Sequence, residues 1–354
     1  MPTESFLLTE PLRAGVPEPG IVPVPNATGH RLPELDGLRG LAGLLVLFHH
    51  TLQVPTGGFL GVDLFFVLSG FLISSLLLTE ITRRGVPRFG HFYRRRATRL
   101  LPAFCCMILL YLGLRFCFGP QVPWIGPRQA LAVLLLSDIH VVTPYLGHAW
   151  SLSVEWQFYF VWPFVMTAMA RAGLNRSGIA SVALLGVLAL WVLEYWCAIS
   201  LRVDGLLLGS ALPAAIGRPW FRRTAACHRN VVEASFWLAF VGFLALSFLA
   251  SYPAPWMGRW VYSLAAILGA LIVGTLLLSH APLTRRSLGN PVMVHFGRIS
   301  YGLYLYHFPI AAFMFVRHFS PLAMMVVGVT VSVALADCSW RYLEAPLLRL
   351  HRTS

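Results

Sequence analysis

The sequence predicts an all-α protein, a polytopic integral membrane bundle of about ten transmembrane helices with both termini in the cytoplasm. Of its 354 residues, 57% are hydrophobic and only 12% are charged, whereas soluble domains average about 25% charged residues. Apolar segments close to the length that a bilayer requires, about 20 residues, recur along the chain. Arginines gather in alternate connections between them, which is typical of cytoplasmic loops.

The predicted elements follow one another with short connections. Residues 1–32 are rich in Pro, Gly and Glu, and we expect a disordered tail there. Residues 33–348 form the membrane domain, and 349–354 a short cytoplasmic tail. The predicted spans lie near 37–55, 59–80, 100–118, 150–170, 178–199, 203–217, 232–251, 260–279, 297–316 and 322–341.

The loop arginines set the orientation of these spans. Loops 81–99 and 218–229, the stretch 280–298 and the C-terminal tail carry arginines, whereas 51–58, 119–128, 144–149 and 252–259 carry few or none. This alternation requires that the short apolar segment 130–143 does not cross the membrane. It also accounts for the net charge of +13, so no nucleic-acid partner is expected. No Cys or His spacing predicts a metal site.

Arg39 and His50 share the first apolar helix, eleven positions apart. At 100° per residue this is about three turns, so both side chains lie on one face, about 16 Å apart along the axis. Ionisable residues inside a membrane usually serve function, and an imidazole can accept and return a proton near neutral pH. We therefore predict a catalytic or ligand-contacting His50. The alternative is a histidine that merely hydrogen-bonds a neighbouring helix.

Two further sets of charged residues are predicted to belong to the functional site. Asp63, in the second span, could pair with an arginine or orient His50, or be purely structural. Arg95, Arg96 and Arg99 precede the third span, and guanidinium groups suit phosphates and diphosphates. Their alternative role is topology and lipid head-group binding.

A polar stripe opens the fourth span. Ser151, Glu155 and Tyr159 are four residues apart and share a helix face. A lipid-facing carboxylate is costly, so Glu155 is expected to face the inside of the bundle. There it would act as an acid/base, orient a hydroxyl, or only hydrogen-bond a neighbouring helix. Tyr304 and His307 share one face of a later helix with Ser300, and His307 is a second buried imidazole. The predicted substrate-contacting residues are these two with Trp150, Ser151, Ser153, Tyr159, Arg202 and Asp204.

Six motifs in this order resemble the membrane acyltransferase-3 family, which includes O-antigen and exopolysaccharide O-acetylases. The resemblance covers roughly residues 33–348. The matching residues are Arg39 with His50, the segment 63–71, Arg95-Arg96-x-x-Arg99-x-x-Pro102, Trp150-Ser151-Leu152-Ser153-x-Glu155-x-Gln157-x-Tyr159, Arg202-x-Asp204 and Ser300-Tyr301-x-x-Tyr304-x-x-His307.

The resemblance implies an O-acyltransferase of the bacterial inner membrane. Its donor would be cytoplasmic acyl-CoA, usually acetyl-CoA, as co-substrate with no permanently bound cofactor. Its acceptor would be a hydroxyl of an envelope glycan or of a small secreted product, with membrane lipid around it. His50 would be the essential histidine, and Arg39, Arg95, Arg96 and Arg99 would handle the donor. The competing interpretation is a proton-coupled transporter or flippase of a glycan or lipid-linked product.

Overall fold

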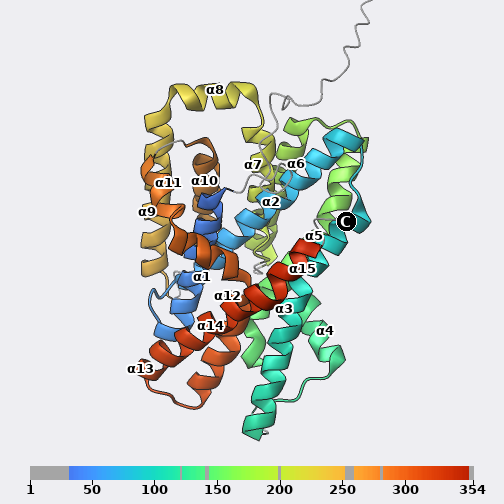
Figure 1. Ribbon diagram of the computed structural model, residues 1–354. Coiled ribbons are helices and arrows are strands. Elements are labelled where there is room, and N and C mark those ends of the chain that lie inside the picture. Colours follow the sequence, from blue (N-terminus) through green and yellow to red (C-terminus); the bar gives the residue numbers. More distant parts are fainter. Residues whose placement is uncertain are drawn as a thin grey trace, which may run out of the picture.

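The computed structural model describes residues 32–119, 122–139, 143–197, 201–251, 259–279 and 282–350. Every regular element within these ranges is a helix (Figure 1), which confirms the all-α prediction. The tail predicted at 1–32 lies outside the described residues except for Leu32. The tail predicted at 349–354 is described only as far as Leu350.

Most of the helices are long. Their bounds are α1 Pro33–Leu52, α2 Gly61–Arg84, α3 Phe89–Phe118, α5 Trp150–Arg171, α6 Arg176–Cys197, α7 Asp204–Ile216, α9 Arg229–Leu249, α10 Arg259–Leu278 and α12 Pro291–Val316. Shorter pieces connect them: η1 Gly58–Leu60, α4 Pro127–Leu135, η3 Pro144–Ala149, α8 Pro219–Cys227 and α11 Pro282–Leu288. The last helix runs over Pro321–Leu350 as α13, α14 and α15, joined by two π-helical turns at Met324–Gly328 and Trp340–Glu344.

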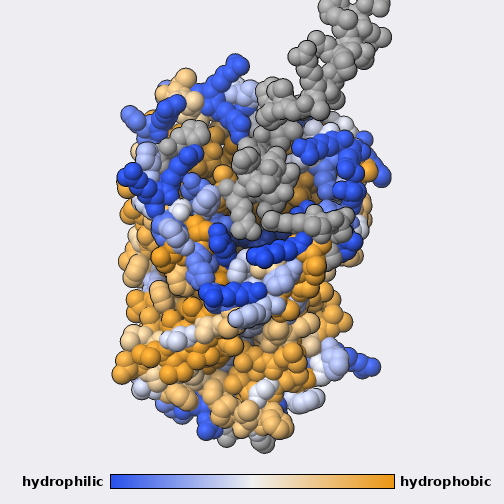
Figure 2. Space-filling view, in the orientation of Figure 1, coloured by the Kyte–Doolittle hydropathy of each residue, from blue (hydrophilic) through white to orange (hydrophobic). Residues whose placement is uncertain are grey.

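Seven of the described helices are long and apolar enough to cross a membrane. Their apolar residues form a band around the middle and lower part of the molecule in Figure 2, whereas hydrophilic residues gather toward the end where α8 lies. The chain is therefore a multi-pass membrane protein. Helix α4, in the segment predicted not to cross, has nine residues, about 14 Å against a hydrocarbon core of about 30 Å.

Helix α3 differs from the prediction. Its apolar part was expected to begin near residue 100, but the helix begins at Phe89 and is 30 residues long. Hydropathy marks only the apolar half of such a helix, because arginines at its polar end interrupt the pattern without interrupting the backbone hydrogen bonds. As a result, the arginines predicted to enter the third span are held on helical backbone.

Several helices pack with their backbones in contact, among them α1 with α12 and α2 with α7. A Cβ atom at Gly297 of α12 would overlap the carbonyl oxygen of Asp36 in α1, and one at Gly209 of α7 would overlap that of Val67 in α2. Small residues allow this approach between membrane helices. The contact between α1 and α12 fixes the relative position of the two helices that carry Arg39, His50, Tyr304 and His307.

Candidate active site

A basic cavity opens between α1, α3, α12 and the last helix. It occupies about 1,580 Å³ and is lined by Arg39, Arg95, Arg96, Arg99, Arg298 and Arg349, together with Asp36, Trp340 and apolar residues. The Nε atoms of Arg39 and Arg96 are buried and have no hydrogen-bond partner within the described part of the chain. Such unpaired guanidinium donors provide a site for an anionic ligand.

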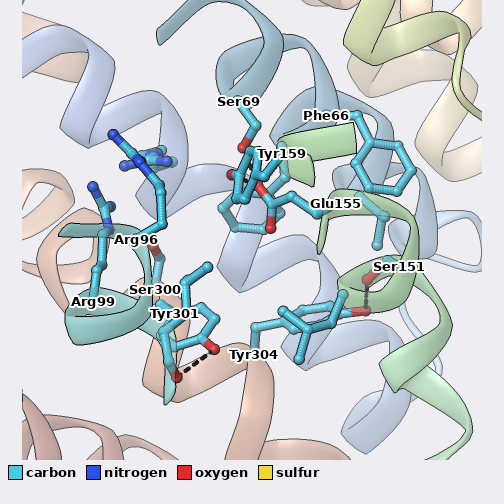
Figure 3. Close-up of a pocket in the computed structure, with 15 residues that line it drawn as sticks. Phe66, Ser69, Arg96, Arg99, Ser151, Glu155, Tyr159, Ser300, Tyr301 and Tyr304 are labelled. Atoms are coloured by element: carbon cyan, nitrogen blue, oxygen red, sulfur yellow. Dashed lines mark hydrogen bonds between the residues drawn. The ribbon is translucent and has the colours of Figure 1, made fainter. Parts of the chain in front are cut away.

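A second cavity, of about 670 Å³, adjoins the first, and Figure 3 shows the residues that line it. The two share Arg39, Arg96 and Arg99 in their walls. Arg95 lines only the larger one. Ser151, Glu155 and Tyr159, the polar stripe predicted on one face of α5, all line the second cavity. The expected inward orientation of Glu155 is thus confirmed.

Glu155 is the carboxylate of the second cavity. Its Oε1 atom accepts hydrogen bonds from the hydroxyls of Ser69 in α2 and Tyr159 in α5. The guanidinium of Arg96 lies 5.8 Å from the centre of the Tyr159 ring. The carboxylate is therefore held by two hydroxyl donors beside the arginines, in a position to receive or orient a proton of a bound molecule.

Ser151 and Tyr304 form the end of this cavity opposite the arginines (Figure 3). The Tyr304 hydroxyl donates to the carbonyl oxygen of His148 at 2.7 Å. Because this uses its single proton, the Ser151 hydroxyl donates to Tyr304 across 2.6 Å. The Tyr304 ring lies between this cavity and a cluster of histidines.

The histidine cluster comprises His50, His148 and His307. Ring centres are 5.1 Å apart for His50 and His307, 5.8 Å for His148 and His307, and 5.7 Å for Tyr304 and His307. His50 lines neither cavity. It contacts His307, which contacts Tyr304, and Tyr304 lines the second cavity. Arg39 lines the second cavity together with Ser300 of α12, and His50 contacts His307 of the same helix.

His148 belongs to η3, the connection that precedes α5 and lies outside the predicted spans. Burial lowers the pKa of its imidazole from 6.5 to about 3. The ring is stacked on Phe308 of α12, with centres 4.7 Å apart and an interplanar angle of 23°. The His148 side chain is therefore a neutral imidazole at physiological pH, and its ring lies next to that of His307.

Asp63 pairs with Arg202, one of the alternatives weighed above. Their Oδ2 and Nη2 atoms are 2.6 Å apart. The Arg202 guanidinium lies between the rings of Trp150 and Tyr262, 4.5 Å and 4.1 Å from their centres. Neither Asp63 nor Arg202 lines the two cavities. The cluster instead joins the N-terminal ends of α2, α5 and α10 to the residues that precede α7.

Two other predicted residues are turned away from the cavities. The hydroxyl of Ser153 accepts from the backbone N–H of Ser137 and donates to the carbonyl of Val133, so it fixes α4 against α5. The carboxylate of Asp204 accepts from Trp191 and from the N–H of Gly205 at the start of α7. Both side chains are satisfied within the protein.

The comparison with known families decides the identity of this arrangement. The family model of the acyltransferase domain, Acyl_transf_3, matches residues 32–341. The chain belongs to the acyltransferase-3 family. The matched range includes both cavities up to Trp340 and the whole histidine cluster.

Individual relatives agree with this membership. O-acetyltransferases OatA of Staphylococcus aureus strains NCTC 8325 / PS 47 and COL are each 28% identical over 349 residues. A second strain COL protein, provisionally named as an O-acetyltransferase, is 28% identical over 346 residues. Each alignment covers 89% of this chain and 57% of the relative, so the acyltransferase-3 chain spans little more than half of these relatives. No solved structure matches it.

Several residues of this acyltransferase-3 site were not predicted as site residues. Ser69 lies in the matching segment 63–71 and Arg298 in the arginine-bearing stretch 280–298, but neither was predicted as a site residue. His148 lies two positions before Trp150, and its polar side chain beside a predicted substrate-contacting run was the available signal. Tyr301 donates to the carbonyl of Leu100 and completes the cavity wall.

Proposed function

We propose that this chain is a membrane O-acyltransferase, which moves an acetyl group from cytoplasmic acetyl-CoA to a hydroxyl of a glycan or of a glycosylated small molecule. One observation carries the proposal. The arginine-lined cavity shares Arg39, Arg96 and Arg99 with a second cavity that contains Ser69, Glu155 and Tyr159, and Tyr304 in the wall of that second cavity lies beside the histidine cluster. The acyltransferase-3 family and the names of its relatives support this reaction.

The basic cavity suits the CoA part of the donor. A CoA molecule carries a diphosphate and a further phosphate, and bidentate guanidinium groups bind such anions. Arg96 and Arg99 line both cavities, so a donor bound there would direct its thioester toward Glu155. Arg39 would stabilise negative charge near the thioester.

The reaction transfers one proton from the acceptor hydroxyl to the CoA sulfur. The acceptor oxygen forms a bond to the acyl carbon, the carbon–sulfur bond breaks, and the hydroxyl proton ends on the sulfur of CoA. In our proposal His50 takes this proton from the hydroxyl and passes it to the thiolate. Opening of the contact between Ser151 and Tyr304 would bring the acyl group from the cavity to the histidines.

The membrane arrangement that fits this reaction has ten spans and both termini in the cytoplasm of a bacterial inner membrane. In this arrangement α1, α5 and α7 cross in addition to the seven helices that are long and apolar enough to span, and α4 does not. The arginine-rich cavity then faces the cytoplasm, where acetyl-CoA is made, and the histidines lie toward the outer leaflet.

Purified protein in detergent tests the proposal directly. With acetyl-CoA and a hydroxylated glycan, we expect free CoA thiol to appear only when both are present, and the acetyl ester to be found on the glycan by mass spectrometry. His50→Gln should lower this rate by about 100-fold or more, and His295→Gln, at a half-buried position of α12 that lines neither cavity, should leave it unchanged. Glycan transport into vesicles without CoA release would instead establish a carrier.

A further inference from the structure

His50 and His307 meet through their ring nitrogens. The Nε2 atom of His307 lies 3.3 Å from the Nδ1 atom of His50. We propose that His307 is a positioning residue for His50, which holds its ring and accepts from its Nδ1–H when His50 carries the positive charge of the reaction. This inference rests on the proposed function, because it assigns His50 the role of base.

The backbone fixes which nitrogen of each ring carries the proton. The Nδ1 atom of His50 is 2.9 Å from the carbonyl oxygen of Val46, and Nδ1 of His307 is 3.0 Å from that of Leu303. Because a carbonyl oxygen can only accept, both Nδ1 atoms carry hydrogen. The Nε2 atom of His307 therefore has a free electron pair, and this pair faces the Nδ1–H of His50.

This arrangement leaves Nε2 of His50 as the basic atom. The Nδ1–H of His50 is shared between the Val46 carbonyl and Nε2 of His307, so the ring is held by two acceptors on one side. On its other sides it contacts the edges of His49 and Phe308, with ring centres 4.8 Å and 4.9 Å away. Nε2 is then free to take a proton from a hydroxyl.

His307 occupies the place that a carboxylate often takes beside a catalytic histidine. Within the described residues, no carboxylate is hydrogen-bonded to His50, and no group of His, Cys, Asp or Glu side chains can hold a metal ion. His307 is 1% exposed and lies on α12, whose backbone is packed against α1. Its acceptor atom is therefore preorganised rather than recruited during the reaction.

The proposed role concerns the charged state of His50. When Nε2 takes the hydroxyl proton, the ring becomes an imidazolium, and its Nδ1–H bonds strengthen because the donor is now charged. Two acceptors then stabilise the cation until the Nε2 proton moves to the CoA sulfur. Loss of one acceptor should thus lower kcat while leaving the binding of acetyl-CoA in the distant arginine cavity unchanged.

Two substitutions separate this role from simple packing. His307→Leu removes the acceptor, and we expect kcat to fall about 10- to 100-fold with KM for acetyl-CoA within about twofold of wild type. His307→Gln places a carbonyl oxygen near the lost Nε2 atom and should recover most of kcat. His295→Gln, on the same helix but half-buried beside Asp337 and outside both cavities, is the matched control.

The outcomes distinguish the two proposals. Wild-type protein without acceptor-dependent CoA release would overturn the proposed function. With active wild type, a normal kcat in His307→Leu, or equal losses in the Leu and Gln variants, would overturn the role of His307 alone. Nitrogen-15 NMR of histidine-labelled wild type, assigned by the signals lost in His50→Gln and His307→Gln, gives an activity-independent test. Protonated Nδ1 in both rings is expected, and a protonated Nε2 in His307 would contradict the inference.

Discussion

The hydroxyl of Tyr304 lies 2.6 Å from that of Ser151, and this contact joins α12 to the start of α5. On one side of it lies the cavity with Glu155, and on the other lie His148 and His307. The pair therefore separates the arginine-lined space from the histidine cluster. Its hydrogen bond contributes to holding the start of α5 against α12.

Tyr304→Phe should destabilise the protein. The change removes the donor to the His148 carbonyl and the acceptor of the Ser151 hydroxyl, and leaves only the 3.4 Å contact between these two groups. Loss of a buried hydrogen bond of this kind costs about 1–3 kcal/mol. Denaturant unfolding in mixed micelles measures the loss in free energy of unfolding. Tyr342→Phe, at a position 80% exposed, serves as the control; equal stability of the two variants would show that the Tyr304 contact contributes nothing.

Arg96→Gln should weaken donor binding. Loss of one guanidinium from the shared wall of the two cavities is expected to raise Kd for acetyl-CoA about tenfold or more, because hydrogen bonds to charged groups contribute about 1.5–3 kcal/mol. Isothermal calorimetry on the purified protein gives Kd. Arg94→Gln is the matched control on the same helix, since Arg94 is exposed and lines neither cavity. The same Kd in both variants would remove Arg96 from the donor site.

Glu155→Gln should lower kcat without unfolding the protein. The amide oxygen can still accept from Ser69 and Tyr159, but the negative charge beside the arginines is lost. We expect a decrease of about 100-fold in acetyl transfer, in the range typical of acid–base groups. Glu80→Gln, at the end of α2 and outside both cavities, controls for the loss of a carboxylate. Full activity of Glu155→Gln would make this residue structural.

Arg202→Ala should be strongly destabilising, because it leaves the 1%-exposed Asp63 carboxylate without its cation. Breaking a buried pair in this way costs about 3–5 kcal/mol. The double variant Asp63→Asn with Arg202→Gln removes both charges and should recover a large part of this loss. Unfolding in mixed micelles measures each free energy, and the same stability in the single and double variants would disprove the pairing argument.

His148 should make stability depend on pH. Its pKa of about 3 in the folded protein lies below the ordinary 6.5, so between these values the unfolded chain binds a proton that the folded chain does not. Stability contributed by this group is complete above pH 6.5 and falls as the pH decreases, by about 2 kcal/mol between pH 7 and pH 5. His148→Phe keeps the stacking on Phe308 and should lose less stability over this interval. Parallel pH curves for the two proteins would contradict this expectation.

The sequence was most informative where helical periodicity alone decides geometry. The eleven-residue spacing of Arg39 and His50 and the four-residue spacing of Ser151, Glu155 and Tyr159 each placed side chains on one face, because an α-helix fixes such relations locally. Inward orientation of the stripe followed from the cost of a charge in lipid.

Contacts between distant segments could not be predicted in the same way. Nothing in the spacing of His50 and His307 brings their nitrogens together, since this depends on how α1 and α12 cross. The packing of Ser153 against α4 likewise depends on a connection whose path was not predictable from hydropathy. Helix α3 shows the remaining difficulty, because charged residues hide the beginning of a helix that extends beyond its apolar part.

The backbone contact between Gly297 and Asp36 has a mechanical consequence. Helices α1 and α12 are packed so closely there that neither can slide along the other without a steric clash. The two helices therefore form one rigid unit that carries the imidazoles of His50 and His307. A substrate that enters between the helices would therefore displace other helices rather than these two, and the hydrogen bond from Ser151 of α5 to Tyr304 of α12 is one contact that such a movement would break.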